Sequence, residues 1–128
     1  PDNPNLYSTL GDLYFSEKKY AQTITAYEHS LAIKPDNPHA LNNLAWLHAT
    51  CEVPNFRDPQ KALYLAEKAA GLEQSPYILD TLAESYFAND RFEEAVESEI
   101  KALELTVTNR SYYKKQLKRF MEAAEKAP

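Results

Sequence analysis

An internal repeat with a unit of 34 residues is the feature that most restricts the fold of this chain. The sequence Pro-Asp-Asn-Pro occurs at positions 1–4 and again at positions 35–38, and a third copy of the unit follows. Alignment of the three copies brings pairs of a leucine and a small residue into register: Leu10-Gly11, Leu44-Ala45 and Leu82-Ala83. Units of this length pack mainly on their neighbours in the chain, so the sequence predicts a repeat protein.

Proline marks where the repeated helices begin. Asn, Asp or Ser followed by proline is typical of a helix start, because the first residue caps the helix and proline suits its first turn. This pair occurs as Asn3-Pro4, Asn37-Pro38, Asp58-Pro59 and Ser75-Pro76. Together with the apolar spacing, it predicts helices over 4–16, 20–33, 38–50, 59–72, 76–88, 92–105 and 110–126. The two glycines are too few for a fold with many tight turns, so the sequence predicts an all-α protein.

Composition excludes several classes of protein. The 128 residues, of which 44% are hydrophobic, suit one domain with a core of its own. No apolar run approaches the roughly 20 residues of a membrane span, and the single cysteine rules out an internal disulfide. The net charge of −5 argues against nucleic acid as a partner. We therefore expect a soluble domain over 1–128 that neither spans a membrane nor binds nucleic acid.

The recurring residues resemble the signature of the tetratricopeptide repeat family. They are Tyr7, Leu10, Gly11, Tyr14, Tyr27 and Pro35 in the first copy, Leu41, Leu44, Ala45, Ala62 and Ala69 in the second, and Leu82, Ala83, Tyr86, Ala95 and Ala102 in the third. The resemblance implies a right-handed α-solenoid of three antiparallel helix pairs, at 4–37, 38–75 and 76–109, and a capping helix at 110–126. Because the motif at 35–38 joins two pairs, its copy at 1–4 leads us to expect a segment of a longer repeat protein.

The last helix is expected to cover the third pair. Five apolar residues recur at spacings that place them on one face of a helix: Tyr113, Leu117, Phe120, Met121 and Ala124. Glu99 stands where the family usually has an aromatic residue, and a buried carboxylate is unfavourable unless it is paired. We therefore expect Glu99 to be exposed, or to meet Lys114 or Lys118 of the last helix.

The connection between the two helices of the second pair is unusually long. It runs from Cys51 to Pro59, about five residues more than the connections in the other copies. Two interpretations are open: a tolerated surface insertion, or a lip at one end of a binding groove.

Catalytic and metal sites are not expected in this chain. Its histidines are His29, His39 and His48, and the last two, although on one helix, are about two and a half turns apart, too far for joint metal binding. Ser8, Asp12 and His39 could meet across neighbouring helices, but no set of oxyanion donors accompanies them. We therefore predict no catalytic, cofactor-binding or metal site, and a protein that is not an enzyme.

The first helix of each pair carries the candidate binding residues. The resemblance implies that these helices line the concave surface of the solenoid, where we expect a peptide groove made of Asp12, His39, Asn42, Asn43, Trp46, Tyr77, Asp80, Thr81 and Glu84. Amides can pair with a main chain and aromatic rings give flat apolar contact. Carboxylates favour Lys or Arg on the ligand. This set predicts a non-enzymatic module that binds a peptide or helix of a partner protein, with a preference for basic residues.

Two other functions can be weighed against this prediction. In the structural alternative, the repeats form a spacer or a self-association segment of a larger protein, and homo-oligomers form through the terminal repeats. Chaperone-binding members of the family hold a terminal carboxylate with lysine, asparagine and arginine side chains. The corresponding positions here are Ser8, Asp12, Asn43, Tyr77 and Thr81, of which only Asn43 matches. We therefore do not expect this chain to bind such a carboxylate.

Overall fold

The computed structural model describes residues 2–128, so Pro1, the first residue of the first Pro-Asp-Asn-Pro, lies outside the described residues. Within 2–128 the chain forms seven α-helices, one 3₁₀ turn and no strand. The elements are α1 Pro4–Ser16, α2 Tyr20–Ile33, α3 Pro38–Thr50, η1 Pro54–Phe56, α4 Pro59–Leu72, α5 Pro76–Ala88, α6 Phe92–Leu105 and α7 Arg110–Lys126. The all-α prediction is confirmed, and the helix bounds agree with those expected from the sequence.

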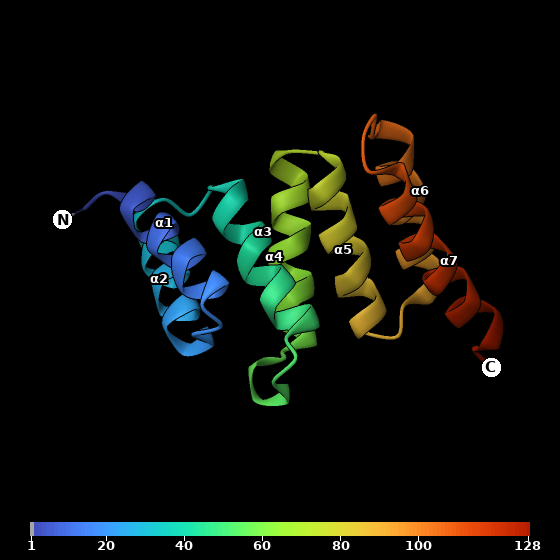
Figure 1. Ribbon diagram of the computed structural model, residues 1–128, viewed down its shortest axis with the longest axis horizontal. Coiled ribbons are helices and arrows are strands. Elements are labelled where there is room, and N and C mark those ends of the chain that lie inside the picture. The colour runs from blue at the N-terminus through green and yellow to red at the C-terminus, as the bar shows by residue number, and fades with distance from the viewer. Residues whose placement is uncertain (1) are drawn as a thin grey trace.

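The helices stack as pairs along one axis (Figure 1). α1 packs with α2, α3 with α4 and α5 with α6, and α7 packs on α6 at the far end of the stack. The first helices of the pairs follow one another along the stack, and the two ends of the chain lie at its opposite ends (Figure 1). Within residues 2–128, none of the helices combines the length and the apolar character that crossing a membrane requires.

Side-chain caps explain where three of the helices begin. Asn3, Asn37 and Asp58 each accept a hydrogen bond from a backbone amide in the first turn of the helix that follows. These bonds satisfy amides that have no partner within the helix. α5 differs from the prediction, because the hydroxyl of Ser75 donates to the carboxylate of Glu73 at 2.9 Å.

Small residues allow the two helices of a pair to approach closely. Gly11 of α1 lies against the ring of Tyr27 of α2, and that tyrosine is only 1% exposed. The equivalent positions of the second pair hold Ala45 and Ala66, which belong to one buried cluster. Gly11, the smallest residue, is thus paired with the large ring of Tyr27, so the combined side-chain volume at this contact still allows the two helices to pack closely.

The substitution Gly11→Ala is expected to destabilise the protein by about 1–3 kcal/mol, because extra volume in a packed core forces its neighbours to move. A methyl group built on Gly11 would lie 2.5 Å from the ring of Tyr27. Gly71→Ala is the matched control, because its position on α4 is open in the described chain, and helix propensity favours alanine there by up to about 1 kcal/mol. Urea denaturation checks both signs, and a Gly11→Ala protein as stable as the wild type would contradict the packing argument.

α7 covers the third pair, as its apolar spacing predicted. Phe120 is fully buried and Tyr113 is 8% exposed, while Leu117 and Ala124 are partly buried. The expectation for Met121 is wrong, since its side chain is 46% exposed. Met121 follows Phe120 directly and so points about 100° away from the buried face.

Candidate functional site

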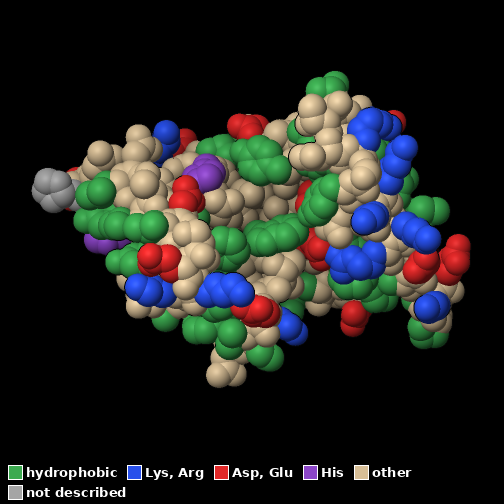
Figure 2. All heavy atoms as spheres, viewed as in Figure 1, with side chains coloured by type: hydrophobic (Ala, Val, Ile, Leu, Met, Phe, Trp, Pro, Cys, Tyr) green, Lys and Arg blue, Asp and Glu red, His purple; other side chains and the backbone are tan. Residues whose placement is uncertain are grey.

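The candidate site is the face of the stack along which α1, α3, α5 and α7 follow one another, here called the concave face. Figure 2 shows this face hollowed between α3 and α5, with Lys and Arg side chains gathered towards α7. Hydrogen bonds between side chains connect α1 to α3 on one side of the hollow and α5 to α7 on the other. The face therefore consists of two polar clusters with a hollow between them.

The first cluster brings together three of the predicted groove residues. Nε2 of His39 lies 3.0 Å from the carboxylate of Asp12, and the side-chain amide of Asn43 donates to the same carboxylate at 3.2 Å. The hydroxyl of Tyr27 donates to Asp12 from the buried side. Burial, followed by the bond to Asp12, raises the pKa of Tyr27, so the hydroxyl remains a donor. The Asp12 and His39 side chains are 45% and 48% exposed and are open to a ligand.

Trp46 lies on α3 one turn beyond this cluster. Its indole is half-buried, and its spacing from Asn43 places both on one flank of the helix. Ala49 and Thr50 continue the helix into the wall of a cavity of about 530 Å³. Trp46 thus occupies the interval between the first cluster and the cavity.

The cavity joins the ends of α3 and α5 to α7. Its lining consists of Ala49, Thr50, Arg57, Pro59, Glu84, Phe87, Ala88, Asp90 and Arg119. Arg57 comes from the long connection of the second pair, which is held in place by a 2.9 Å hydrogen bond from Nδ1 of His48 to the carbonyl of Phe56. The end of the connection at Arg57 therefore borders the cavity, while the rest of it extends beyond the ends of α3 and α4 (Figure 1).

The expectation that Asp80 and Glu84 face an open groove is wrong. They are 4% and 7% exposed, because α7 lies across them. Tyr112 donates to Asp80 at 2.6 Å, Gln116 donates to Glu84 at 2.7 Å, and Arg119 forms an ion pair with Glu84. The acidic flank predicted for the groove is therefore occupied by donors of the protein itself.

Two other predicted groove residues are also buried. Asn42 is 5% exposed and its amide donates to Asn43 at 3.1 Å. Thr81 is 2% exposed and its hydroxyl donates to the carbonyl of Tyr77 at 3.0 Å. Both lie towards the core side of their helices, so the prediction of exposure is wrong for them. Tyr77 is 44% exposed and remains accessible on the concave face.

Glu99 lies behind the second cluster and is fully buried. Neither of its carboxyl oxygens has a hydrogen-bond partner within residues 2–128. Burial, followed by the neighbouring carboxyl groups of Asp80 and Glu84, raises the pKa of Glu99 to about 10, although Arg119 opposes this shift. Glu99 is therefore a neutral carboxylic acid at pH 7.

The prediction that Glu99 meets Lys114 or Lys118 is also wrong. Lys114 and Lys118 are exposed, and the cation close enough to Glu99 to affect its pKa is Arg119. The sequence did contain a signal for this arrangement, because Tyr112, Gln116 and Arg119 are donors at positions i, i+4 and i+7 of one helix. This spacing places the three donors on one face of the helix.

The described residues do not support a metal-binding site. Residues 2–128 contain no group of three or more His, Cys, Asp or Glu side chains that could hold a metal ion. The arrangement on the concave face offers instead hydrogen-bonding groups, half-exposed aromatic rings and a cavity, which are the components of a surface that binds polypeptide.

Comparisons with known proteins agree with this architecture. Residues 11–50 match the family model for the TPR, or tetratricopeptide, repeat. No curated protein matches the sequence. The TPR domain of Sgt2 from Aspergillus fumigatus is 22% identical, covers 95% of this chain and 79% of its own, and superposes with a TM-score of 0.81.

Two further solved structures have the same fold. The first TPR domain of human RPAP3 is 22% identical, with coverage of 96% of this chain and 95% of its own and a TM-score of 0.80. The first TPR of Spaghetti (RPAP3), solved bound to the HSP90 peptide SRMEEVD, is 21% identical, with coverage of 95% and 93% and a TM-score of 0.82. Residues 11–50 thus match the tetratricopeptide repeat family, and the described chain as a whole has the fold of solved tetratricopeptide repeat domains.

Proposed function

We propose that this protein is a non-enzymatic interaction module that holds a peptide or helical segment of a partner protein on its concave face. The observation that carries this proposal is the position of Trp46, half-buried between the Asp12–His39–Asn43 cluster and the cavity of about 530 Å³. A partly exposed tryptophan among polar groups is the composition of an interface hot spot. A segment that lies along α3 would contact all three features in turn.

The polar cluster at one end of this path would bind the ligand by hydrogen bonds. Asp12 and His39 are exposed and held in fixed positions by their contact with each other and by Asn43 and Tyr27. Side chains that are already ordered lose little entropy when they bind. Asp12 would accept from a Lys or Arg side chain or from main-chain amides of the ligand.

The cavity end of the path carries both signs of charge. Glu84 is paired with Arg119, whereas Arg57 and Asp90 line the cavity from exposed positions. A preference for basic residues therefore rests on Asp12, because Arg57 lies beside Asp90 in the lining of the cavity and suits an acidic side chain. We propose a ligand of mixed charge, with its basic end towards Asp12, an apolar residue on Trp46 and an acidic residue near Arg57.

The acidic HSP90 peptide of the Spaghetti complex is not expected to bind in this groove. Of the residues here that correspond to the carboxylate clamp, Ser8 and Thr81 are buried and Asp12 would repel a carboxylate. Titration of the protein with SRMEEVD should therefore leave the emission of Trp46 unchanged. Saturable binding of this peptide, abolished by Trp46→Ala, would contradict the charge argument while supporting the groove.

The groove itself can be tested with a phage-displayed library of random peptides, selected on the wild-type protein. We expect the selected peptides to change the emission of Trp46, the only tryptophan, and to lose about 2 kcal/mol or more of binding free energy with Trp46→Ala. Tyr64→Ala is the matched control, because this 64% exposed aromatic belongs to α4, the second helix of its pair. Peptides that bind equally to the wild type and to Trp46→Ala would place binding elsewhere.

Trp46 is a better test of the groove than Asn43. In the structure Asn43 donates to Asp12 and to Tyr27 and accepts from Asn42. Its removal would leave the nearly buried amide of Asn42 without this acceptor, so a loss of binding could not be separated from a loss of stability.

A further inference from the structure

We infer that the long connection of the second pair, residues 51–58 between α3 and α4, is a brace that fixes the orientation of the first helix pair relative to the second. Through this orientation it positions Asp12 of α1 against His39 of α3, at the start of the Trp46 path. The structural part of the inference goes beyond the proposed function, and only its effect on peptide binding rests on that function.

The brace is a fixed part of the second pair. Nδ1 of His48, on α3, donates to the carbonyl of Phe56 at 2.9 Å, and the backbone amide of Asp58 donates to the carbonyl of His48 at the same distance. His48 is itself buried. Within the brace, the backbone amide of Arg57 donates to the carbonyl of Pro54 at 3.1 Å. These bonds tie both ends of the segment to α3, so it is not a free loop.

The brace also contacts the first residue of α2. The hydroxyl of Tyr20 donates to the carboxylate of Glu52 at 2.8 Å, and the ring centroids of Tyr20 and Phe56 are 5.8 Å apart. Tyr20 in turn meets Phe15 of α1 edge to face, with 6.2 Å between the ring centroids. The hydrogen bond is exposed, so the aromatic contacts supply most of the restraint. A row of three rings therefore connects the brace to both helices of the first pair.

The apolar packing between the first two pairs involves a different part of α2. The shared cluster contains Ile24, Tyr27 and Leu31 of α2, which lie one to three turns beyond Tyr20. The contact of α2 with α3 is also less extensive than either contact between the second and third pairs. Apolar packing is not directional, so the cluster alone would let the first pair pivot. A second attachment at Tyr20 prevents this rotation.

The third pair has a shorter form of the same attachment. The side-chain amide of Asn89, in the turn between α5 and α6, donates at 2.8 Å to the carbonyl of Pro59, the first residue of α4. In both places, the turn of one pair bonds to the first residue of the second helix in the preceding pair. A short turn is sufficient where the helices contact each other extensively. The longer brace spans the junction where they contact each other less.

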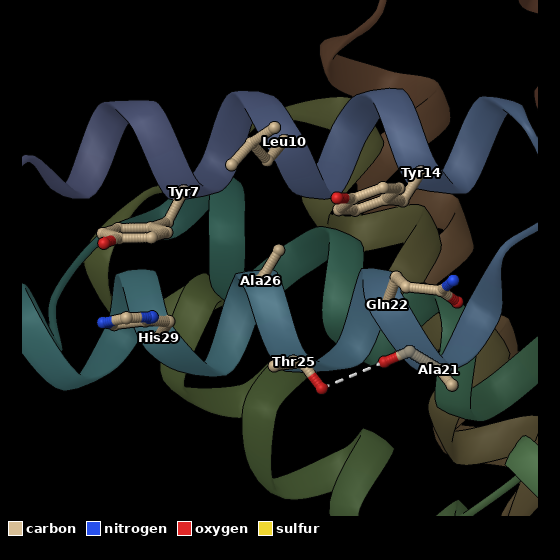
Figure 3. A pocket seen from close by; sticks show the side chains of 8 residues that line it. All are labelled: Tyr7, Leu10, Tyr14, Ala21, Gln22, Thr25, Ala26 and His29. Carbon is tan, nitrogen blue, oxygen red and sulfur yellow. Dashed lines mark hydrogen bonds between the residues drawn. The ribbon is translucent and has the colours of Figure 1, made fainter.

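A restraint on α2 also holds α1, because the two helices form one unit. Figure 3 shows the rings of Tyr7 of α1 and His29 of α2 facing each other, with Ala26 of α2 pointing towards α1. The two rings stack with their centroids 3.8 Å apart. Phe15, the last ring of the row, follows Asp12 by three residues and is its neighbour on the helix surface. The brace therefore acts on the part of α1 that carries Asp12.

The polar cluster of the site depends on this orientation. Asp12 belongs to the first pair, whereas His39 and Asn43, which lie 3.0 and 3.2 Å from its carboxylate, belong to the second. Hydrogen bonds weaken when such distances grow by a few tenths of an ångström. A pivoting first pair would break both bonds for part of the time. The brace thus keeps the cluster ordered before a ligand arrives, which reduces the entropy lost on binding.

NMR spectroscopy of the full chain tests the inference with two variants that break the brace from opposite sides. Tyr20→Ala removes the ring and the hydroxyl on α2, whereas Glu52→Ala/Phe56→Ala removes their partners and leaves α2 unchanged. In both variants we expect the residual dipolar couplings of α1 and α2 to be scaled down relative to those of α3–α6. Amide exchange in α1 and α2 should become about tenfold faster. Tyr64→Ala is the matched control, a 64% exposed tyrosine on the second helix of the next pair, and should change neither.

Two results would overturn the inference: couplings of α1–α6 that still fit one common orientation in both variants, or amide exchange that accelerates equally in all helices. The second result would indicate a general loss of stability. Library peptides that depend on Trp46 should bind both variants roughly tenfold more weakly, and unchanged affinity would contradict the effect on the site. If no selected peptide depends on Trp46, the proposed function fails, while the couplings still decide whether the brace exists.

Discussion

Replacing Glu99 with glutamine is expected to raise the free energy of unfolding by about 3 kcal/mol at pH 7 and to leave it nearly unchanged at pH 4. Glu99 is fully buried, and burial raises the pKa of its carboxyl to about 10 from an ordinary value of 4.5. At neutral pH the folded protein therefore holds a neutral acid, whereas the unfolded chain holds a carboxylate. Glutamine has nearly the same shape and is neutral in both states, so it avoids the free energy of taking up a proton.

The pH dependence follows from the direction of this shift. A group whose pKa is raised by folding supports the folded state fully at pH values below its ordinary pKa. That support is lost as the pH rises from 4.5 towards the folded value of about 10, at about 1.4 kcal/mol per pH unit. The interval between 4.5 and pH 7 gives the expected 3 kcal/mol.

Urea denaturation of the wild type and of Glu99→Gln, at several pH values between about 4 and 8, checks this prediction. The difference between the two proteins should grow steadily with pH. Glu104→Gln is the matched control, because Glu104 is exposed on the same helix, and its difference from the wild type should be small at every pH. A difference for Glu99→Gln that does not vary with pH would show that the buried carboxyl is not the cause.

Most of the fold could be predicted because the sequence signals for it are local and recur along the chain. The pair of a capping residue and a proline gives the first residue of α1, α3, α4 and α5. Small residues such as Gly11 and Ala45 recur at the contact between paired helices, and the structure has them there. Both signals act over a few residues, so neither requires knowledge of distant contacts.

The site was predicted less completely because its exposure depends on distant contacts. Asp12, His39 and Asn43 meet as expected, since neighbouring pairs repeat with a fixed register. Asp80 and Glu84 were assigned to the open face by the same register, but α7 lies across them, and the register of the helix pairs does not predict where this last helix packs. Lys114 and Lys118 were expected to make the contacts of the last helix, whereas an arginine, a glutamine and a tyrosine make them.

The substitution Phe120→Ala is expected to lower the free energy of unfolding by about 3–5 kcal/mol, the usual effect of removing a buried aromatic ring. Phe120 is fully buried, and its ring centroid lies 5.2 Å from that of Phe87 on α5. The guanidinium of Arg119 lies 4.7 Å from the centroid of the same ring. Met121→Ala on the same helix is the control, because that side chain is 46% exposed and should matter by less than about 1 kcal/mol. Equal losses for the two variants would contradict the assignment of Phe120 as the anchor of α7.

Phe120→Ala and Glu99→Gln are also expected to depend on each other. Phe120 holds α7 in place, and α7 with its Arg119 forms part of the surroundings of Glu99. If the loss of the ring loosens α7, water reaches Glu99, and the free energy needed to keep it neutral falls. Glu99→Gln should then stabilise Phe120→Ala by at least about 1 kcal/mol less than it stabilises the wild type, as measured by a double-mutant cycle at pH 7. The coupling should disappear at pH 4, where Glu99 is protonated in either background, and strict additivity at pH 7 would mean that α7 does not keep water from this carboxyl.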